Sequence, residues 1–127
     1  MQPQAPAATS SVASAASGLT DLEFHQRTGR ILASIETTID QWLQDDVIDI
    51  DGQRTGGLLE LSFPGGSKIV INTQPPLHEL WLAARAGGYH FRHVDGRWIE
   101  REGLEFFDVL SARASEQAGR PLAFVSA

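Results

Sequence analysis

The 127-residue sequence contains no cysteine. A disulfide framework, a zinc–thiolate site and a cysteine nucleophile are therefore excluded. Apolar runs are short, and none approaches the ~18 residues that a membrane-spanning helix needs. The first 18 residues lack the basic start and the leucine-rich centre of a secretory signal. We therefore expect a cytoplasmic protein that has no membrane partner.

The common motifs of catalysis and nucleotide binding are also missing. No serine lies in a nucleophile elbow, and neither glycine-rich phosphate-binding motif occurs. The four histidines form no HExxH or other closely spaced metal-binding pattern. We therefore expect that the protein is not an enzyme.

Negative charge is concentrated in one quarter of the chain. Residues 19–51 contain eight Asp and Glu against two Arg, so this segment alone carries the net charge of −6. Residues 52–127 contain eight acids and eight bases. Such a field attracts cations or a basic protein surface and repels phosphates. We therefore expect no nucleic-acid partner.

The chain divides into a polar leader and one domain. Residues 1–18 are mostly Ala, Ser, Pro and Gln, so we expect a disordered leader there and a domain over residues 19–127. Thr20 and Glu23 match a capping box at the start of a helix over Asp21 to about Leu43. Its apolar residues recur at helical spacing: Phe24, Ile31, Leu32, Ile35, Ile39 and Trp42.

Alternating segments after this helix predict an antiparallel sheet. The acidic run 45–51 alternates like a strand, and turn signals separate further strands at 58–63, 67–72, 80–84, 89–94 and 97–101. Asp95-Gly96 indicates a tight type I′ hairpin. A second helix is expected from about Leu104 to Ala118, before Gly119. These elements predict an α+β fold, a two-layer α-β sandwich with both helices on one face of the sheet.

Two groups of residues are candidates for a function. On the first helix, His25, Glu36 and Asp40 share one flank, and the acidic run would extend this negative ridge. Carboxylates are the ligands that hard cations prefer, although composition alone favours a solvated surface. Trp81 lies near Asn72 and Gln74 on the predicted sheet, either in the core or as an outward recognition anchor.

The sequence resembles the frataxin family, most closely its bacterial CyaY type. The resemblance rests on GSKIVINTQPPLHELWLAARAGGYHF at 66–91, EFH at 23–25, IDID at 48–51 and FFDVL at 106–110. It implies weak, exchangeable binding of Fe²⁺ or Fe³⁺ by the ridge, with no iron–sulfur cluster held by this cysteine-free chain. The implied ridge positions are Glu23, Glu36, Asp40, Asp45, Asp49 and Asp51, with His25 as a neighbour and Asp46 as an extension.

The resemblance also implies partners and a regulatory role in iron–sulfur cluster assembly. The acidic surface would contact the cysteine desulfurase, and Asn72, Gln74 and Trp81 would meet the scaffold protein, which favours an exposed Trp81. We expect a monomer, with metal-driven oligomers left open. Relatives often have further acids at the positions of Thr37, Gln41, Leu43 and Val47, so the ridge is thinner here. The alternatives are a pure interaction protein and, less favoured, a ferroxidase or iron store.

Overall fold

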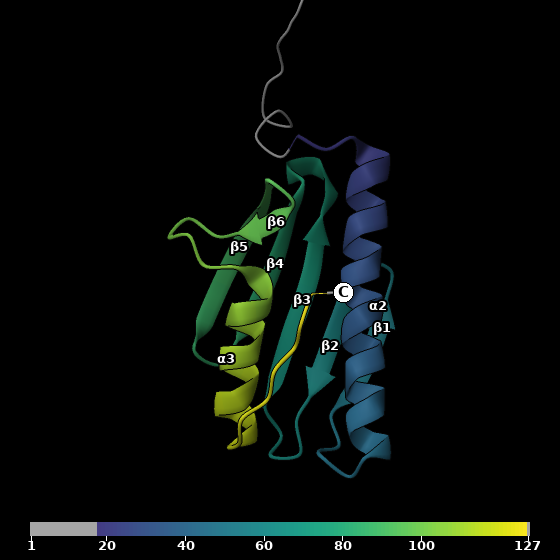
Figure 1. Cartoon of the computed structure of the whole chain (residues 1–127), viewed down its shortest axis with the longest axis vertical. Helices are drawn as coiled ribbons and strands as arrows, with labels where there is room; N and C mark the ends of the chain where they lie inside the picture. Colours follow the sequence, from purple (N-terminus) through teal and green to yellow (C-terminus); the bar gives the residue numbers. More distant parts are fainter. Residues whose placement is uncertain (1–17, 127) are drawn as a thin grey trace, which may run out of the picture.

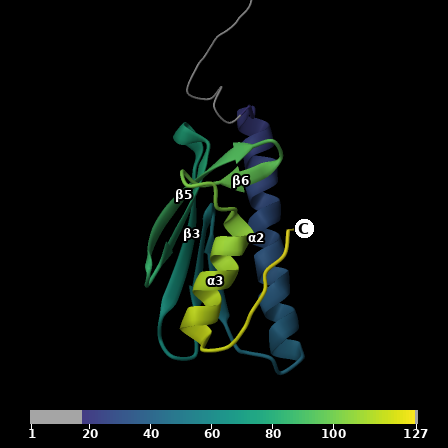
Figure 2. The same ribbon diagram turned by 60° about the vertical axis from the view of Figure 1, so that its left-hand side comes forward.

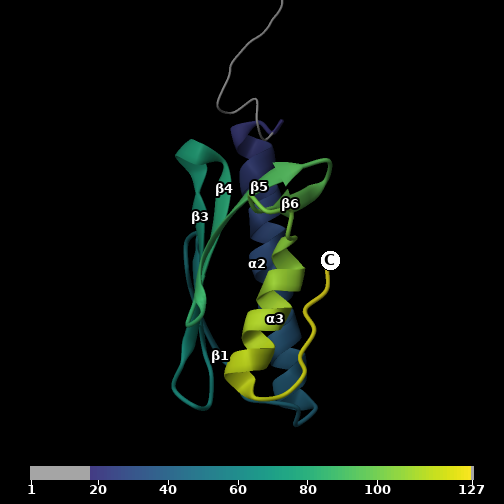
Figure 3. The same ribbon diagram turned by 90° about the vertical axis from the view of Figure 1, so that its left-hand side faces the viewer.

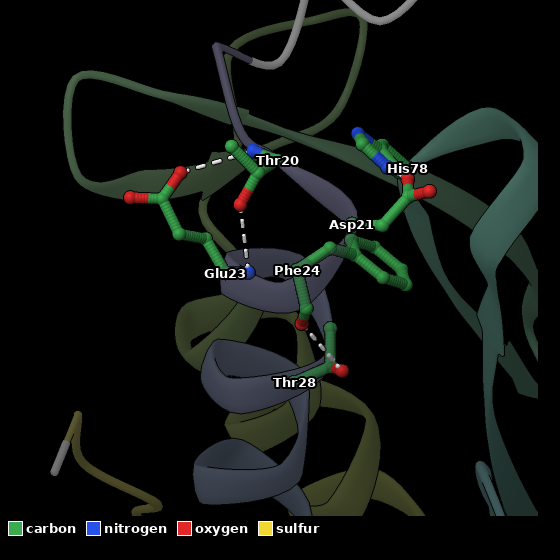
Figure 4. Close-up of polar contacts among 6 residues, drawn as sticks. All are labelled: Thr20, Asp21, Glu23, Phe24, Thr28 and His78. Carbon is green, nitrogen blue, oxygen red and sulfur yellow. Dashed lines mark hydrogen bonds and ion pairs between the residues drawn. The ribbon is translucent and has the colours of Figure 1, made fainter.

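The first helix, α2 (Asp21–Gln44), starts at the predicted capping box. The Thr20 hydroxyl accepts the Glu23 N–H at 3.1 Å, and the Glu23 carboxylate accepts the Thr20 N–H at 2.9 Å (Figure 4). Both bonds satisfy backbone donors that a helix N-terminus otherwise leaves unpaired.

The structure is a computed structural model that describes residues 18–126, and the expected leader lies outside this range except for Gly18.

Six antiparallel strands follow α2 and pair in the order of the chain. They are β1 (Asp51–Thr55), β2 (Leu58–Ser62), β3 (Lys68–Gln74), β4 (Glu79–Ala84), β5 (Gly87–Val94) and β6 (Arg97–Ile99). A short 3-10 helix, η1 (Pro75–Leu77), joins β3 to β4. Both long helices lie on the same side of the sheet (Figures 1 and 3), which confirms the predicted two-layer sandwich.

The second long helix, α3 (Phe106–Ala118), begins two residues later than predicted because Glu105 is its N-cap. Its end at Gly119, which has φ +71°, agrees with the expected glycine stop. The segment that follows runs back between the two helices (Figure 2), where Leu122 and Phe124 are buried. The hydroxyls of Ser111 and Ser115 hold this segment through backbone hydrogen bonds of 2.9–3.2 Å.

Close packing sets the position of α2 over the edge strand β1. A Cβ at Gly52 would lie only 2.8 Å from Ile39 Cδ1, so the helix approaches the strand where there is no side chain. One turn earlier on α2, Glu36 forms a 2.9 Å ion pair with Arg54. From the Glu36–Arg54 contact to the Ile39–Gly52 contact, residue numbers increase along α2 and decrease along β1, so the helix and the strand run antiparallel. Asp40 and Asp51 each come directly after the second contact, and they therefore lie at the same level.

The prediction of a strand over residues 45–51 is wrong. Instead α2 ends in a Schellman-type turn, in which the Asp46 N–H bonds to Leu43 O and the Val47 N–H to Trp42 O. Asp46 has φ +58°, the left-handed conformation that usually belongs to glycine at this position. Residues 47–50 then form an irregular link to β1, in which Ile50 is buried and Asp49 is exposed.

The first strand therefore begins only at the last residue of the acidic run. β1 covers Asp51–Thr55 and pairs with β2 from Asp51–Ser62 to Thr55–Leu58. The five other predicted strands are confirmed to within two residues at each end. Asp95 and Gly96 both have positive φ, as a type I′ hairpin requires.

Asp46 in the Schellman-type turn destabilises the fold for two reasons. A left-handed non-glycine residue costs conformational energy, and a carboxylate near a helix C-terminus faces the negative end of the helix dipole. We expect Asp46→Gly to raise the free energy of unfolding by about 0.5–1 kcal/mol. Urea unfolding followed by circular dichroism measures the change.

Asp46→Asn is the matched control, since asparagine tolerates the same backbone conformation but carries no charge. Its smaller gain should shrink in 1 M salt, where electrostatic effects are screened. A lower stability of Asp46→Gly than of the parent chain would contradict the strain argument.

Candidate functional site

Five aspartates gather where α2 meets β1, and we call this group the acidic end: Asp40, Asp45, Asp46, Asp49 and Asp51. All five are exposed, and within residues 18–126 none of them forms an ion pair. Two accept side-chain amide hydrogen bonds, Asp45 from Gln41 at 3.1 Å and Asp51 from Gln53 at 3.4 Å. The packing of Ile39 on Gly52 brings the helix and strand members together.

The acidic end is electrostatically unfavourable for the fold. The last turn of α2 contains no basic residue, and Asp45 is the C-cap. A helix C-terminus carries about half a negative charge, so these aspartates add to charge of the same sign. Arg120 reaches the connecting segment, but it donates to the Val47 carbonyl oxygen rather than to a carboxylate. A bound cation or a basic partner would relieve this repulsion.

Glu36 and the first-turn residues differ from the acidic end. Glu36 is half-buried and paired with Arg54, whose guanidinium offsets its charge. Glu23 and His25 are exposed, but they precede Glu36 by 13 and 11 residues, or roughly 20 and 16 Å along the helix axis. The backbone and side-chain hydrogen bonds with Thr20 lower the pKa of Glu23. The structure therefore separates Glu23 and His25 from the aspartates.

The acidic end is an open surface. Over residues 18–126, no three His, Cys, Asp or Glu side chains converge closely enough to hold a metal ion as they stand. A hard cation bound there would keep most of its water ligands and contact one or two carboxylates. Such an arrangement supports weak, exchangeable binding.

Sequence reasoning missed a buried partner for Asp21. His78, only 4% exposed, places Nε2 2.6 Å from Asp21 Oδ1. Its ring stacks on Phe24 with centroids 5.0 Å apart (Figure 4). This contact ties the β3–β4 connection to the start of α2. The two residues are 57 positions apart, and no local sequence pattern signals such a pair.

The second candidate group lies on the outer face of the sheet, away from the helices. Asn72 and Trp81 are cross-strand partners, and Gln74 pairs with Glu79 one step further along. Trp81 is half-buried and stacks on His90 with centroids 4.0 Å apart, while its Nε1–H donates to Glu79 at 2.8 Å. The alternative of a core position for Trp81 is therefore excluded. Sequence reasoning missed His90 as its stacking partner.

Neither helix in residues 18–126 has the length and apolar character to cross a membrane. The family model of the frataxin-like domain matches residues 17–120. The iron–sulfur cluster assembly proteins CyaY of Burkholderia mallei (strain SAVP1) and Burkholderia pseudomallei (strain 668) are each 46% identical over 107 residues, covering 84% of this chain and 98% of theirs.

Solved structures agree with this match. The frataxin of Psychromonas ingrahamii, from the CyaY protein family, is 35% identical with a TM-score of 0.75, covering 85% of this chain and 100% of its own. Trimeric yeast frataxin complexed with ferrous iron shares the fold at 23% identity and a TM-score of 0.62, over 74% of this chain and 87% of its own. Family model, relatives and fold together show that this chain belongs to the frataxin-like family.

Proposed function

We propose that this chain is a cytoplasmic, iron-binding regulator of iron–sulfur cluster assembly that works without catalysing a reaction. The observation that carries the proposal is the acidic end, five exposed aspartates without ion pairs in residues 18–126 around the C-terminus of α2. Their repulsion costs stability, so a cation that binds there gains the energy of relieving it. Fe²⁺ and Fe³⁺ are cations of this kind, and Glu36, Glu23 and His25 are weaker candidates along α2.

The relatives support iron–sulfur cluster assembly as the pathway. The matched Burkholderia proteins are named for this process, and the trimeric yeast frataxin was solved with ferrous iron. We further propose that this chain binds iron and that it modulates its partners. The absence of cysteine means that the chain would bind the metal ion itself and hold no thiolate-ligated cluster.

Two surfaces would contact two different partners. The acidic end would dock on a basic patch of the cysteine desulfurase, a contact favoured by long-range charge attraction. The outer sheet face, with Asn72, Gln74 and Trp81, would meet the scaffold protein. A half-buried Trp beside amide side chains offers both apolar area and hydrogen bonds, as recognition anchors commonly do.

The iron proposal predicts a localised response to Fe²⁺. In an anaerobic ¹⁵N NMR titration, amide signals of residues 36–51 should shift or broaden, because the metal would bind their carboxylates. Mg²⁺ at the same concentration should leave them largely unchanged. Asp40→Asn, Asp45→Asn and Asp49→Asn combined should abolish the response without unfolding the chain.

A matched control removes three exposed acids elsewhere: Asp95→Asn, Glu102→Gln and Glu116→Gln combined. It changes the net charge equally, so it should bind iron like the parent chain. An equal loss of the iron response in both triple variants would show that the response depends on overall charge rather than on the acidic end. A signal pattern with Fe²⁺ identical to that with Mg²⁺ would contradict iron binding and favour a pure interaction protein.

The partner proposal predicts that a substitution on one surface weakens binding of one partner and leaves binding of the other unchanged. The Asp40, Asp45 and Asp49 triple variant should lose desulfurase binding in a low-salt pull-down, and binding of the parent chain should fall steeply with added salt. Trp81→Ala should weaken scaffold binding about tenfold or more while desulfurase binding persists. Retained desulfurase binding by the triple variant would contradict the assignment of the acidic end.

A further inference from the structure

A pocket of about 420 Å³ lies on the other flank of α2, away from the acidic end. Its walls come from the N-terminal half of α2, the β5–β6 hairpin, the start of α3 and the C-terminal segment. Figure 2 shows β6 lying above the start of α3 beside α2. The volume falls in the range of roughly 300–1,000 Å³ that is typical of small-molecule sites.

The floor of this pocket is apolar and well packed. It consists of Ile31, Trp98 and Phe107, which are 8%, 5% and 6% exposed. Trp98 is held from two sides, by Phe24 at a centroid distance of 5.9 Å and by His93 at 5.3 Å. A floor fixed in this way can receive a flat or apolar ligand group without first rearranging.

Three arginines line the rim: Arg27 and Arg30 from α2 and Arg97 from β6. Arg27 and Arg30 are three residues apart and therefore neighbours on the helix surface. All three are exposed, and within residues 18–126 none of their guanidinium groups takes part in a hydrogen bond or ion pair. Guanidinium groups bind carboxylates and phosphates in a planar, two-bond geometry.

Two acids share the pocket but do not neutralise it. Glu105 accepts the N–H groups of Phe107 at 3.0 Å and Asp108 at 3.2 Å, so its carboxylate serves as the N-cap of α3. Asp108 is exposed and remains as the competing negative charge. Three guanidinium groups therefore face two carboxylates in the pocket, which leaves an excess of one positive charge beside the positive N-terminal end of α3.

We propose that this arginine-rimmed pocket binds a small organic anion, with a carboxylate or phosphate group on Arg27, Arg30 and Arg97 and an apolar body on Trp98 and Phe107. The site is independent of the iron proposal. Arg30 precedes Asp40 by ten residues, or about 15 Å along α2. Binding here would give the chain a small-molecule input separate from its metal-binding surface.

An ¹⁵N NMR titration of the iron-free chain at low salt tests this inference. The probes are adenosine 5′-monophosphate for phosphates and phthalate for carboxylates, with adenosine as the uncharged control. The Trp98 indole N–H and the amides of Arg27 and Arg97 should shift with at least one anion and not with adenosine. The anion that binds identifies the preferred group, and a lack of shifts with both would overturn the proposal.

Substitutions of the arginines test which side chains contribute to anion binding. Arg27→Gln with Arg30→Gln should weaken binding about tenfold or more, and Arg97→Gln alone should weaken it as well. Asp108→Asn should strengthen binding, because it removes the competing charge. Arg85→Gln with Arg101→Gln is the charge-matched control and should bind like the parent chain. Equal weakening by both double variants would show only general attraction of anions and would overturn the site.

Discussion

The packing of α2 on the edge strand β1 determines where the acidic side chains lie. Ile39 packs against the sheet where Gly52 has no side chain, and the Glu36–Arg54 ion pair forms a second contact one turn earlier on α2. The apolar stripe of α2 is buried, which leaves Asp40 at the helix edge, level with Asp51. A larger residue at position 52 would force the end of the Ile39 side chain to move and would disturb this contact between α2 and β1.

The acidic end is unfavourable for stability, and the proposed metal site depends on the same charges. Asp46 occupies a left-handed position and Asp45 caps a helix end that already carries negative charge. The absence of basic residues in the last turn of α2 leaves this charge uncompensated. Two of the three pocket arginines, Arg27 and Arg30, lie ten or more residues before Asp40 on the same helix, so α2 carries its arginines and the acidic end at different points along its length. The proposed cation surface and the proposed anion pocket therefore lie apart on the domain.

Local patterns predicted most of the fold. The spacing from Phe24 to Trp42 and the Thr20–Glu23 capping box gave α2, and the turn residues gave five strands. The error at 45–51 arose because an alternating run resembles a strand, while the left-handed Asp46 leaves no local signal. The Asp21–His78 and Trp81–His90 contacts depend on tertiary packing, which residue spacing does not reveal. The family resemblance identified the candidate residues, but not their separation along α2.

The most direct test of the account is the free energy of unfolding under anaerobic conditions with increasing Fe²⁺. If iron binds the folded acidic end, the parent chain should gain about 1.4 kcal/mol at ten times the dissociation constant. The chain with Asp40, Asp45 and Asp49 changed to Asn should start more stable, because repulsion is reduced, and should gain nothing from iron. Equal iron-induced gains in both chains, or no gain in the parent chain, would contradict the claim that these aspartates hold the metal.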